Sequence, residues 1–132
     1  MMNVVDRLTE LIGYPEDTAG AFLVDGAVVQ ATEVKERLRF VRRFQRNLPA
    51  DATYTVLAGY AAGRMLKEKA VLAWDPEAKE LMLWQESSAD DSDESLREDF
   101  DLFLDSCDWW DERIKELAQT GRRPITETVI LP

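Results

Sequence analysis

The sequence predicts an α+β fold: a twisted antiparallel sheet with helices packed on it, in the order helix, three strands, helix, two strands, helix. Three observations support this prediction. Apolar residues recur at helical spacing near both ends of the chain, Asp25-Gly26 joins two Val-rich and Phe-rich runs, and Pro76–Lys79 joins two more. With 132 residues, we predict one domain over residues 1–121 and a C-terminal tail over residues 122–132.

The first helix is predicted from the apolar residues at one helical face, which are Val4, Val5, Leu8, Leu11 and Ile12. Gly13 and Pro15 end that pattern. In the following stretch, "AFLVDGAVVQATEV", the Asp-Gly pair favours a tight hairpin turn, because both central positions of such a turn need positive φ. Two antiparallel strands are therefore expected after the first helix.

Residues 37–46 fit two structures. Val34, Leu38 and Val41 suit one face of a helix, whereas Leu38, Phe40 and Arg42 alternate as in a strand. We predict a third strand, because a two-stranded hairpin alone is only marginally stable.

The second helix is predicted over residues 51–67, with Asp51 as a possible N-cap. Gly59 and Gly63 lie inside it, and each costs about 1 kcal/mol relative to Ala. Close packing compensates for that cost in either of two ways: the helix packs tightly on its own sheet, or it forms a self-association face.

Large apolar residues in the last helix recur at steps of four and three, and they define a stripe that must be buried. This stripe consists of Leu96, Phe100, Phe103, Cys107, Trp110, Ile114 and Leu117. Leu102 and Trp109 lie off the stripe and are candidates for a contact surface. Gly121 is the expected stop, and the tail is expected to add an edge strand.

The net charge of −10 is concentrated in one segment. Between Glu86 and Glu116 there are thirteen acidic and three basic residues, so this segment accounts for the whole excess. A field of this sign opposes binding to nucleic acid and to anionic membrane surfaces. A basic cluster interrupts the pattern at Lys35, Arg37, Arg39, Arg42, Arg43 and Arg46. It is either a solvated face partly balanced by the acidic helix, or a site for phosphate or a partner.

The chain lacks the groups on which most catalysis depends. It contains no histidine, which removes the commonest general base and metal ligand. Cys107 lies on the apolar stripe, where a packed side chain is expected rather than a reactive thiol. We therefore expect no enzyme activity, no metal and no cofactor. One cysteine and an N-terminus without an export signal favour a cytoplasmic protein.

Several segments resemble the class I type III secretion chaperones, the Tir-chaperone-like family. The similarity covers about residues 3–118 and includes the helix "VVDRLTELIG", the hairpin "KAVLAWDPEAKELMLW" and the last helix "LREDFDLFLDSCDWWDERIKEL". The resemblance implies a homodimer that holds an extended N-terminal segment of a secreted effector and keeps it ready for export.

The resemblance also implies site residues. Partner-binding patches are expected at Val5, Leu8, Ile12, Phe22, Val24, Val29 and Phe40. The dimer interface is expected at Tyr54, Leu57, Tyr60, Ala61, Met65 and Trp74. The mechanism would be strand addition, with pockets for alternate client side chains. The alternative is a non-catalytic regulator of the same fold, similar to the YbjN-like proteins, that sequesters a cytosolic partner.

Overall fold

The computed structural model describes residues 3–13, 20–24, 26–44, 51–64 and 67–120. The elements are α1 (Val4–Ile12), β1 (Ala21–Val24), β2 (Ala27–Val34), β3 (Arg37–Phe44), α2 (Asp51–Arg64), β4 (Val71–Asp75), β5 (Glu80–Ser88) and α3 (Asp93–Thr120). This order and the α+β class confirm the prediction, and residues 37–44 are a strand. The predicted second helix ends at Arg64, earlier than expected. The predicted stop at Gly121 and the tail lie outside the described residues.

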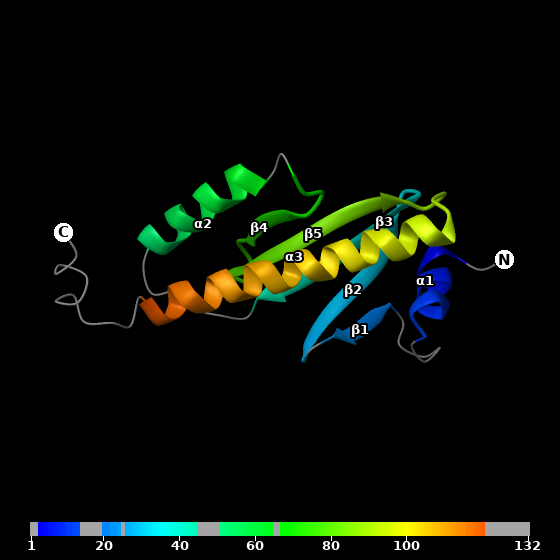
Figure 1. Cartoon of the computed structure of the whole chain (residues 1–132), viewed down its shortest axis with the longest axis horizontal. Helices are drawn as coiled ribbons and strands as arrows, with labels where there is room; N and C mark the ends of the chain where they lie inside the picture. Colours follow the sequence, from blue (N-terminus) through cyan, green and yellow to red (C-terminus); the bar gives the residue numbers. More distant parts are fainter. Residues whose placement is uncertain (1–2, 14–19, 25, 45–50, 65–66, 121–132) are drawn as a thin grey trace.

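The strands form an antiparallel sheet in the order β1-β2-β3-β5-β4. Figure 1 shows α3 running along one face of this sheet, with α1 near its first turns and α2 near its C-terminal half. Along β5 the burial alternates at every residue, with Leu81, Leu83, Gln85 and Ser87 buried. Because successive strand residues point to opposite faces, one face of the sheet lies under α3 and the other is less covered.

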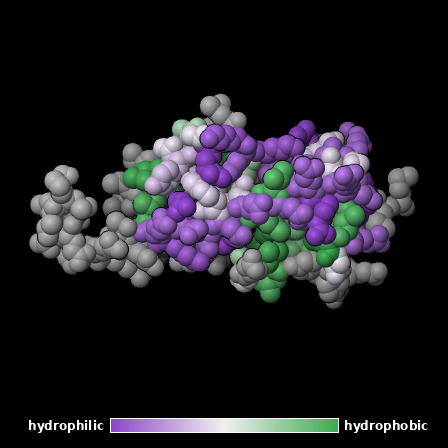
Figure 2. All heavy atoms as spheres, viewed as in Figure 1, coloured by the Kyte–Doolittle hydropathy of each residue, from purple (hydrophilic) through white to green (hydrophobic). Residues whose placement is uncertain are grey.

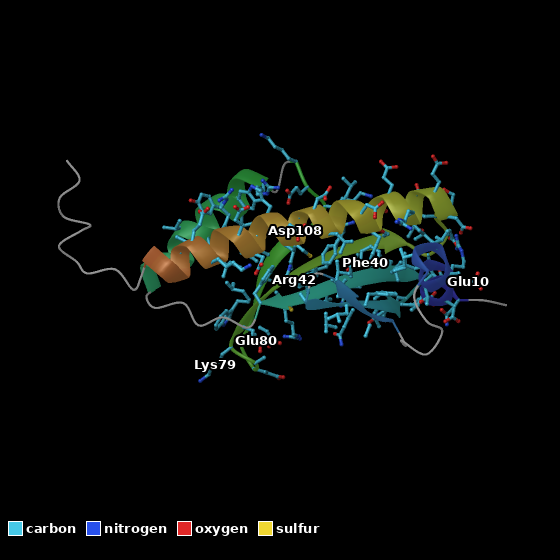
Figure 3. All side chains as sticks on the ribbon, turned by 60° about the horizontal axis from the view of Figure 1, so that its bottom comes forward. Glu10, Phe40, Arg42, Lys79, Glu80 and Asp108 are labelled. Atoms are coloured by element: carbon cyan, nitrogen blue, oxygen red, sulfur yellow. The ribbon has the colours of Figure 1, made fainter. Side chains whose placement is uncertain are left out.

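The core forms where the apolar stripe of α3 meets the covered face of the sheet. The ring of Phe100 lies edge-on to Phe22 and Phe40, at centroid distances of 5.7 Å and 5.4 Å. Phe40 points from β3 toward α3 (Figure 3) and also contacts Phe103, with ring centroids 5.6 Å apart. Six of the seven predicted stripe residues are buried, and the seventh, Leu117, is partly buried. The stripe is therefore confirmed as the element that closes the core.

A small buried polar network holds α3 in register on β5. The hydroxyl of Ser87 donates to the carboxylate of Asp99 at 2.8 Å. The side-chain amide of Gln85 donates to the backbone carbonyl of Asp99 at 3.1 Å, and the Lys69 ammonium lies 3.2 Å from the same carboxylate. Buried polar groups are costly unless they are hydrogen-bonded, so this network disfavours any sliding of α3 along the sheet.

Local capping fixes α1 at the start of α3. Asn3 accepts a hydrogen bond from the backbone of Asp6, and Gly13 ends the helix with a positive φ of 76°. Arg7 donates to the backbone carbonyl of Asp91 at 2.8 Å and to the carboxylate of Asp93 at 2.7 Å. The first helix is therefore anchored to the turn that leads into α3.

We expect Phe100→Ala to lower the free energy of unfolding by about 3–5 kcal/mol, because it removes a ring that is buried against two others. Urea denaturation measures this loss. Leu102→Ala is the matched control on the same helix, since Leu102 is half exposed and its truncation should cost much less. Equal losses in the two variants would contradict the assignment of the core.

Candidate interaction surfaces

The face of the sheet opposite α3 carries half-exposed and exposed side chains, and we call it the open face. Its apolar members include Leu23, Val28, Val41, Met82 and Trp84. Leu23 and Val28 are direct cross-strand partners, and they are 64% and 51% exposed. Figure 2 views the molecule from the α3 side and shows a hydrophilic outer side of α3 with apolar atoms near the β1–β2 hairpin. Leu23 and Val28 are thus exposed apolar residues of the sheet, whereas the outer side of α3 is largely charged.

The arginines of β3 are neutralised mainly by carboxylates of the sheet. Arg37 and Arg39 both bond Glu86, at 2.9 Å and 3.1 Å. Arg43 lies 2.8 Å from Asp75, and Arg39 also stacks over the Trp84 ring at 5.3 Å. Arg37, Arg39 and Arg43 of the basic cluster are therefore a paired row on the open face, whereas Arg42 points toward α3.

These pairs change the acidity of their carboxylates. A hydrogen bond from Arg39 is the main cause that lowers the pKa of Glu86. A hydrogen bond from Arg43 lowers the pKa of Asp75, helped by the backbone N–H of Ala78. Both carboxylates are therefore stabilised in the charged form that keeps the arginine row neutral.

The seven residues predicted to bind a partner divide into two groups. Leu8, Phe22, Val29 and Phe40 are fully buried in the core, where they present no surface. Val5, Ile12 and Val24 are partly buried at its margin. The sequence pattern identified apolar positions on α1 and the first strands without distinguishing the covered face of the sheet from the open one. Leu23 and Val28 were missed, and the strict alternation along β1 and β2 is the signal that marks them.

Helix α2 exposes a narrow stripe of small and apolar residues. It consists of Val56, Gly59, Tyr60 and Gly63, and we call it the α2 stripe. A Cβ built on either glycine meets no atom within 4 Å, so these glycines do not pack against the protein's own sheet. The first of the two explanations for the glycines, tight packing on the protein's own sheet, is therefore wrong, because the helix turns its small residues away from the sheet. A self-association face is the alternative that this finding leaves.

Contacts with one tryptophan hold α2 on α3. The guanidinium of Arg64 lies 3.7 Å from the centroid of the Trp109 ring, and the Tyr60 ring lies edge-on to it at 5.9 Å. Trp109 is therefore partly covered, whereas Leu102 is exposed as predicted. Among the α2 side chains that the structure describes, residues 56–64, Leu57 alone is buried. A helix anchored by so little apolar area depends on further contacts for its stability.

The six predicted dimer residues occupy different environments. Tyr60 and Trp74 are exposed, Ala61 is partly buried, and Leu57 is in the core. The side chains of Tyr54 and Met65 lie outside the described part of the structure. Two of the six predicted positions, Tyr60 and Trp74, thus offer substantial exposed area.

The described residues show neither a metal-binding cluster nor an activated thiol. They contain no cluster of three or more His, Cys, Asp or Glu side chains that would hold a metal ion. Burial raises the pKa of the Cys107 thiol to about 12, so the reactive thiolate is scarce at neutral pH. A search of the described helices finds none that is long and apolar enough to span a bilayer.

Solved structures share this fold. A chain of the HopA1–SchA chaperone–effector complex matches with a TM-score of 0.64 and 16% identity, over 83% of this chain and 91% of that one. A chain of the ExsC–ExsE complex matches with a TM-score of 0.64 and 17% identity, over 83% and 89%. A chain of the ExoT–SpcS complex from Pseudomonas aeruginosa matches with a TM-score of 0.60 and 16% identity, over 80% and 92%.

No protein-family model and no curated protein matches the chain. The resemblance to class I type III secretion chaperones is confirmed at the level of the fold, by three structures that each cover at least 80% of the chain.

We expect Glu86→Gln to destabilise the protein at pH 7 and to have progressively less effect in acid. The folded pKa of Glu86 is lowered, so its pairs stabilise the fold above the ordinary Glu pKa of about 4.3, and this stability is lost as the pH falls through the folded pKa. Urea midpoints between pH 7 and about pH 3 measure the change. Glu98→Gln, at an exposed carboxylate of α3, is the control. A destabilisation by Glu86→Gln that is independent of pH would contradict the role of the charge.

Proposed function

We propose that this protein is a cytosolic, non-catalytic chaperone that binds an extended segment of a secreted effector and keeps it competent for export. The observation that carries the proposal is the exposed apolar area on the open face, in a fold shared with a chain of a chaperone–effector complex. Exposed apolar patches of this kind commonly mark sites for a polypeptide partner.

The mechanism is strand addition at β1. Among the described strands, β1 ends the sheet order and forms its ladder with β2, and the end of a sheet is where a further strand can add. A client strand that pairs there would place alternate side chains over Leu23 and Val28 on the open face. Its other side chains would contact the partly buried margin formed by Val5, Ile12 and Val24. The binding energy comes from main-chain hydrogen bonds and apolar burial, and no bond is made or broken.

The test begins with purification of the tagged protein from its native host and identification of the chain that is bound to it. We expect an effector whose N-terminal segment is protected from proteolysis while the complex is intact. Replacing both Leu23 and Val28 by Asp should weaken client binding at least tenfold, because it places charge on the apolar contact area. Isothermal titration with the identified segment measures the affinity.

Thr32→Asp is the matched control, since Thr32 is an exposed polar residue of β2 on the same open face. The control should bind as the wild type does. Unchanged affinity in the double variant would contradict the proposed surface. A fully folded cytosolic partner without a protected segment would favour the regulator that sequesters a protein.

We further propose that the α2 stripe forms a homodimer interface, together with the exposed Trp74 of β4. Gly59 and Gly63 leave open space on this stripe, which allows the backbone of a second copy to approach closely. The partner helix would supply the apolar contacts that α2 lacks within its own chain. This arrangement also gives a reason for the helix-propensity cost of two glycines.

We expect Tyr60→Glu to convert a dimer into a monomer, because it places a charge in the centre of the α2 stripe. Light scattering after size exclusion should give twice the chain mass of 15.1 kDa for the wild type and the single mass for the variant. Ala58→Glu is the control, since Ala58 is exposed outside the α2 stripe. A monomeric wild type would refute the dimer and leave the client surface untouched.

A further inference from the structure

The sheet divides between β2 and β3 at one end. The last recorded pair between these strands is Val29 with Arg42. Beyond it, β2 continues to pair with β1 as far as Ala27, and β3 continues to pair with β5 as far as Phe44. The two central strands therefore diverge, because each stays paired with its outer neighbour. Beyond Val29 and Arg42, the described residues of β2 and β3 form no ladder pair with each other.

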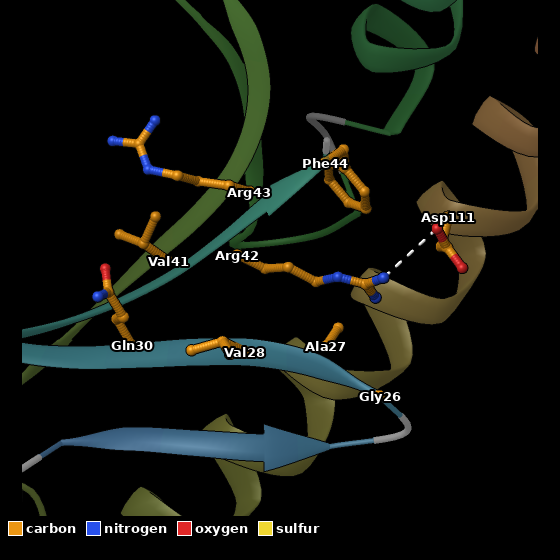
Figure 4. A pocket seen from close by; sticks show the side chains of 9 residues that line it. All are labelled: Gly26, Ala27, Val28, Gln30, Val41, Arg42, Arg43, Phe44 and Asp111. Carbon is orange, nitrogen blue, oxygen red and sulfur yellow. Dashed lines mark ion pairs between the residues drawn. The ribbon is translucent and has the colours of Figure 1, made fainter. Parts of the chain in front are cut away.

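A cavity of about 640 Å³ occupies this divergence, and we call it the fork cavity. Its walls are residues 26–28 and 30 of β2 and the preceding turn, residues 41–44 of β3, and Asp111 of α3. Figure 4 shows Arg42 extending across the cavity from β3 toward Asp111, while Arg43 points the other way. The fork cavity thus combines apolar walls from Val28, Val41 and Phe44 with charged groups, of which the Arg42 guanidinium extends across it.

The guanidinium of Arg42 is incompletely satisfied. Its side chain is only 13% exposed, and its Nε atom is buried with no hydrogen-bond partner. Its remaining polar contacts are long, at 3.5 Å to the carbonyl of Cys107 and 3.4 Å to the carboxylate of Asp111. Asp111 lies closer to Lys115, at 3.0 Å. Charge-assisted hydrogen bonds are typically about 2.7–2.9 Å, so Arg42 retains capacity for an anionic acceptor.

The other β3 arginines each have a closer carboxylate, although the Nε of Arg39 is also buried without a hydrogen-bond partner. Arg43 has Asp75 at 2.8 Å and Glu80 at 3.7 Å. Arg37 and Arg39 share Glu86 at 2.9 Å and 3.1 Å. Among the four arginines of β3, Arg42 has the longest distance to its nearest carboxylate, 3.4 Å to Asp111.

We propose that the fork cavity binds an acidic side chain, Asp or Glu, of the client's extended segment, with its carboxylate on Arg42. This inference rests on the proposed chaperone function and adds a specificity element to it. The segment that pairs along β1 passes the β1–β2 hairpin, whose turn residue Gly26 lines the cavity. The carboxylate would accept hydrogen bonds from the Arg42 guanidinium, and the apolar walls would contact the methylenes of the acidic side chain.

The first experiment needs no client. We would titrate the full-length protein with N-acetyl-glutamate N-methylamide and with its uncharged analogue N-acetyl-glutamine N-methylamide, and follow both by NMR. We expect saturable shifts at the Arg42 Nε–H and at the amides of Ala27 and Phe44 with the glutamate probe. The apparent affinity for the glutamine probe should be at least fivefold lower. Equal responses to both probes, or no response at these groups, would overturn the inference.

Two variants sharpen the result. Arg42→Gln should lower affinity for the glutamate probe at least fivefold, whereas Arg43→Gln, which removes a charge already held by two carboxylates, should not. If Arg42→Gln fails to fold, Arg42→Lys keeps the charge and removes the Nε–H donor, and it should also bind more weakly.

The identified client separates the two proposals. A client that binds wild type about tenfold more tightly than Arg42→Gln supports the fork cavity as a specificity site. A client that binds both equally overturns it and leaves the chaperone function intact. Failure of the wild type to bind any effector refutes the function, whatever the response to the glutamate probe.

Discussion

The structure depends on the burial of one helical stripe against one face of the sheet. The stripe of α3 carries Phe100, Phe103 and Trp110 over the covered face, and the Asp99 network fixes how far along the sheet it lies. Burial of three aromatic side chains contributes several kcal/mol, on the order of the net stability of a small domain. Among the described helices, α3 is the long one that packs on the sheet, and the opposite face keeps exposed apolar side chains such as Leu23 and Val28.

Charge is distributed to match this asymmetry. The outer side of α3 carries exposed carboxylates such as Asp101, Asp105 and Asp108, while the open face carries arginines that are paired with carboxylates of the sheet. The negative helix gives the molecule a net charge that opposes aggregation, and the neutralised sheet does not repel a polypeptide of either sign. The charge of the helix thus offsets the risk that the exposed apolar face creates, because a neutral protein with such a face would tend to aggregate.

The sequence predicted the elements well because each has a local signal. Helical spacing identified α1 and α3, and the Asp-Gly pair identified the first hairpin. The candidate surfaces were harder to predict, because the side of a strand that is covered depends on where α3 lies. Phe22 and Leu23 are adjacent and both apolar, yet Phe22 is fully buried in the core whereas Leu23 is 64% exposed. The fork cavity has no local signal at all, since it results from the register that β2 and β3 share with their outer neighbours.

The same arrangement bears on the proposed binding function. A catalytic site holds its groups rigidly against one another, whereas the features here that would take a partner are dispersed along surfaces. Among the described residues they are a strand at the end of the sheet order, a helix with one buried side chain, and a guanidinium with long contacts. Under the proposed function a second polypeptide would complete each of them: a client strand at the end of the sheet, a second copy of the helix, and an acidic side chain on the guanidinium. The proposal thus asks one kind of partner, another polypeptide, to account for all three features.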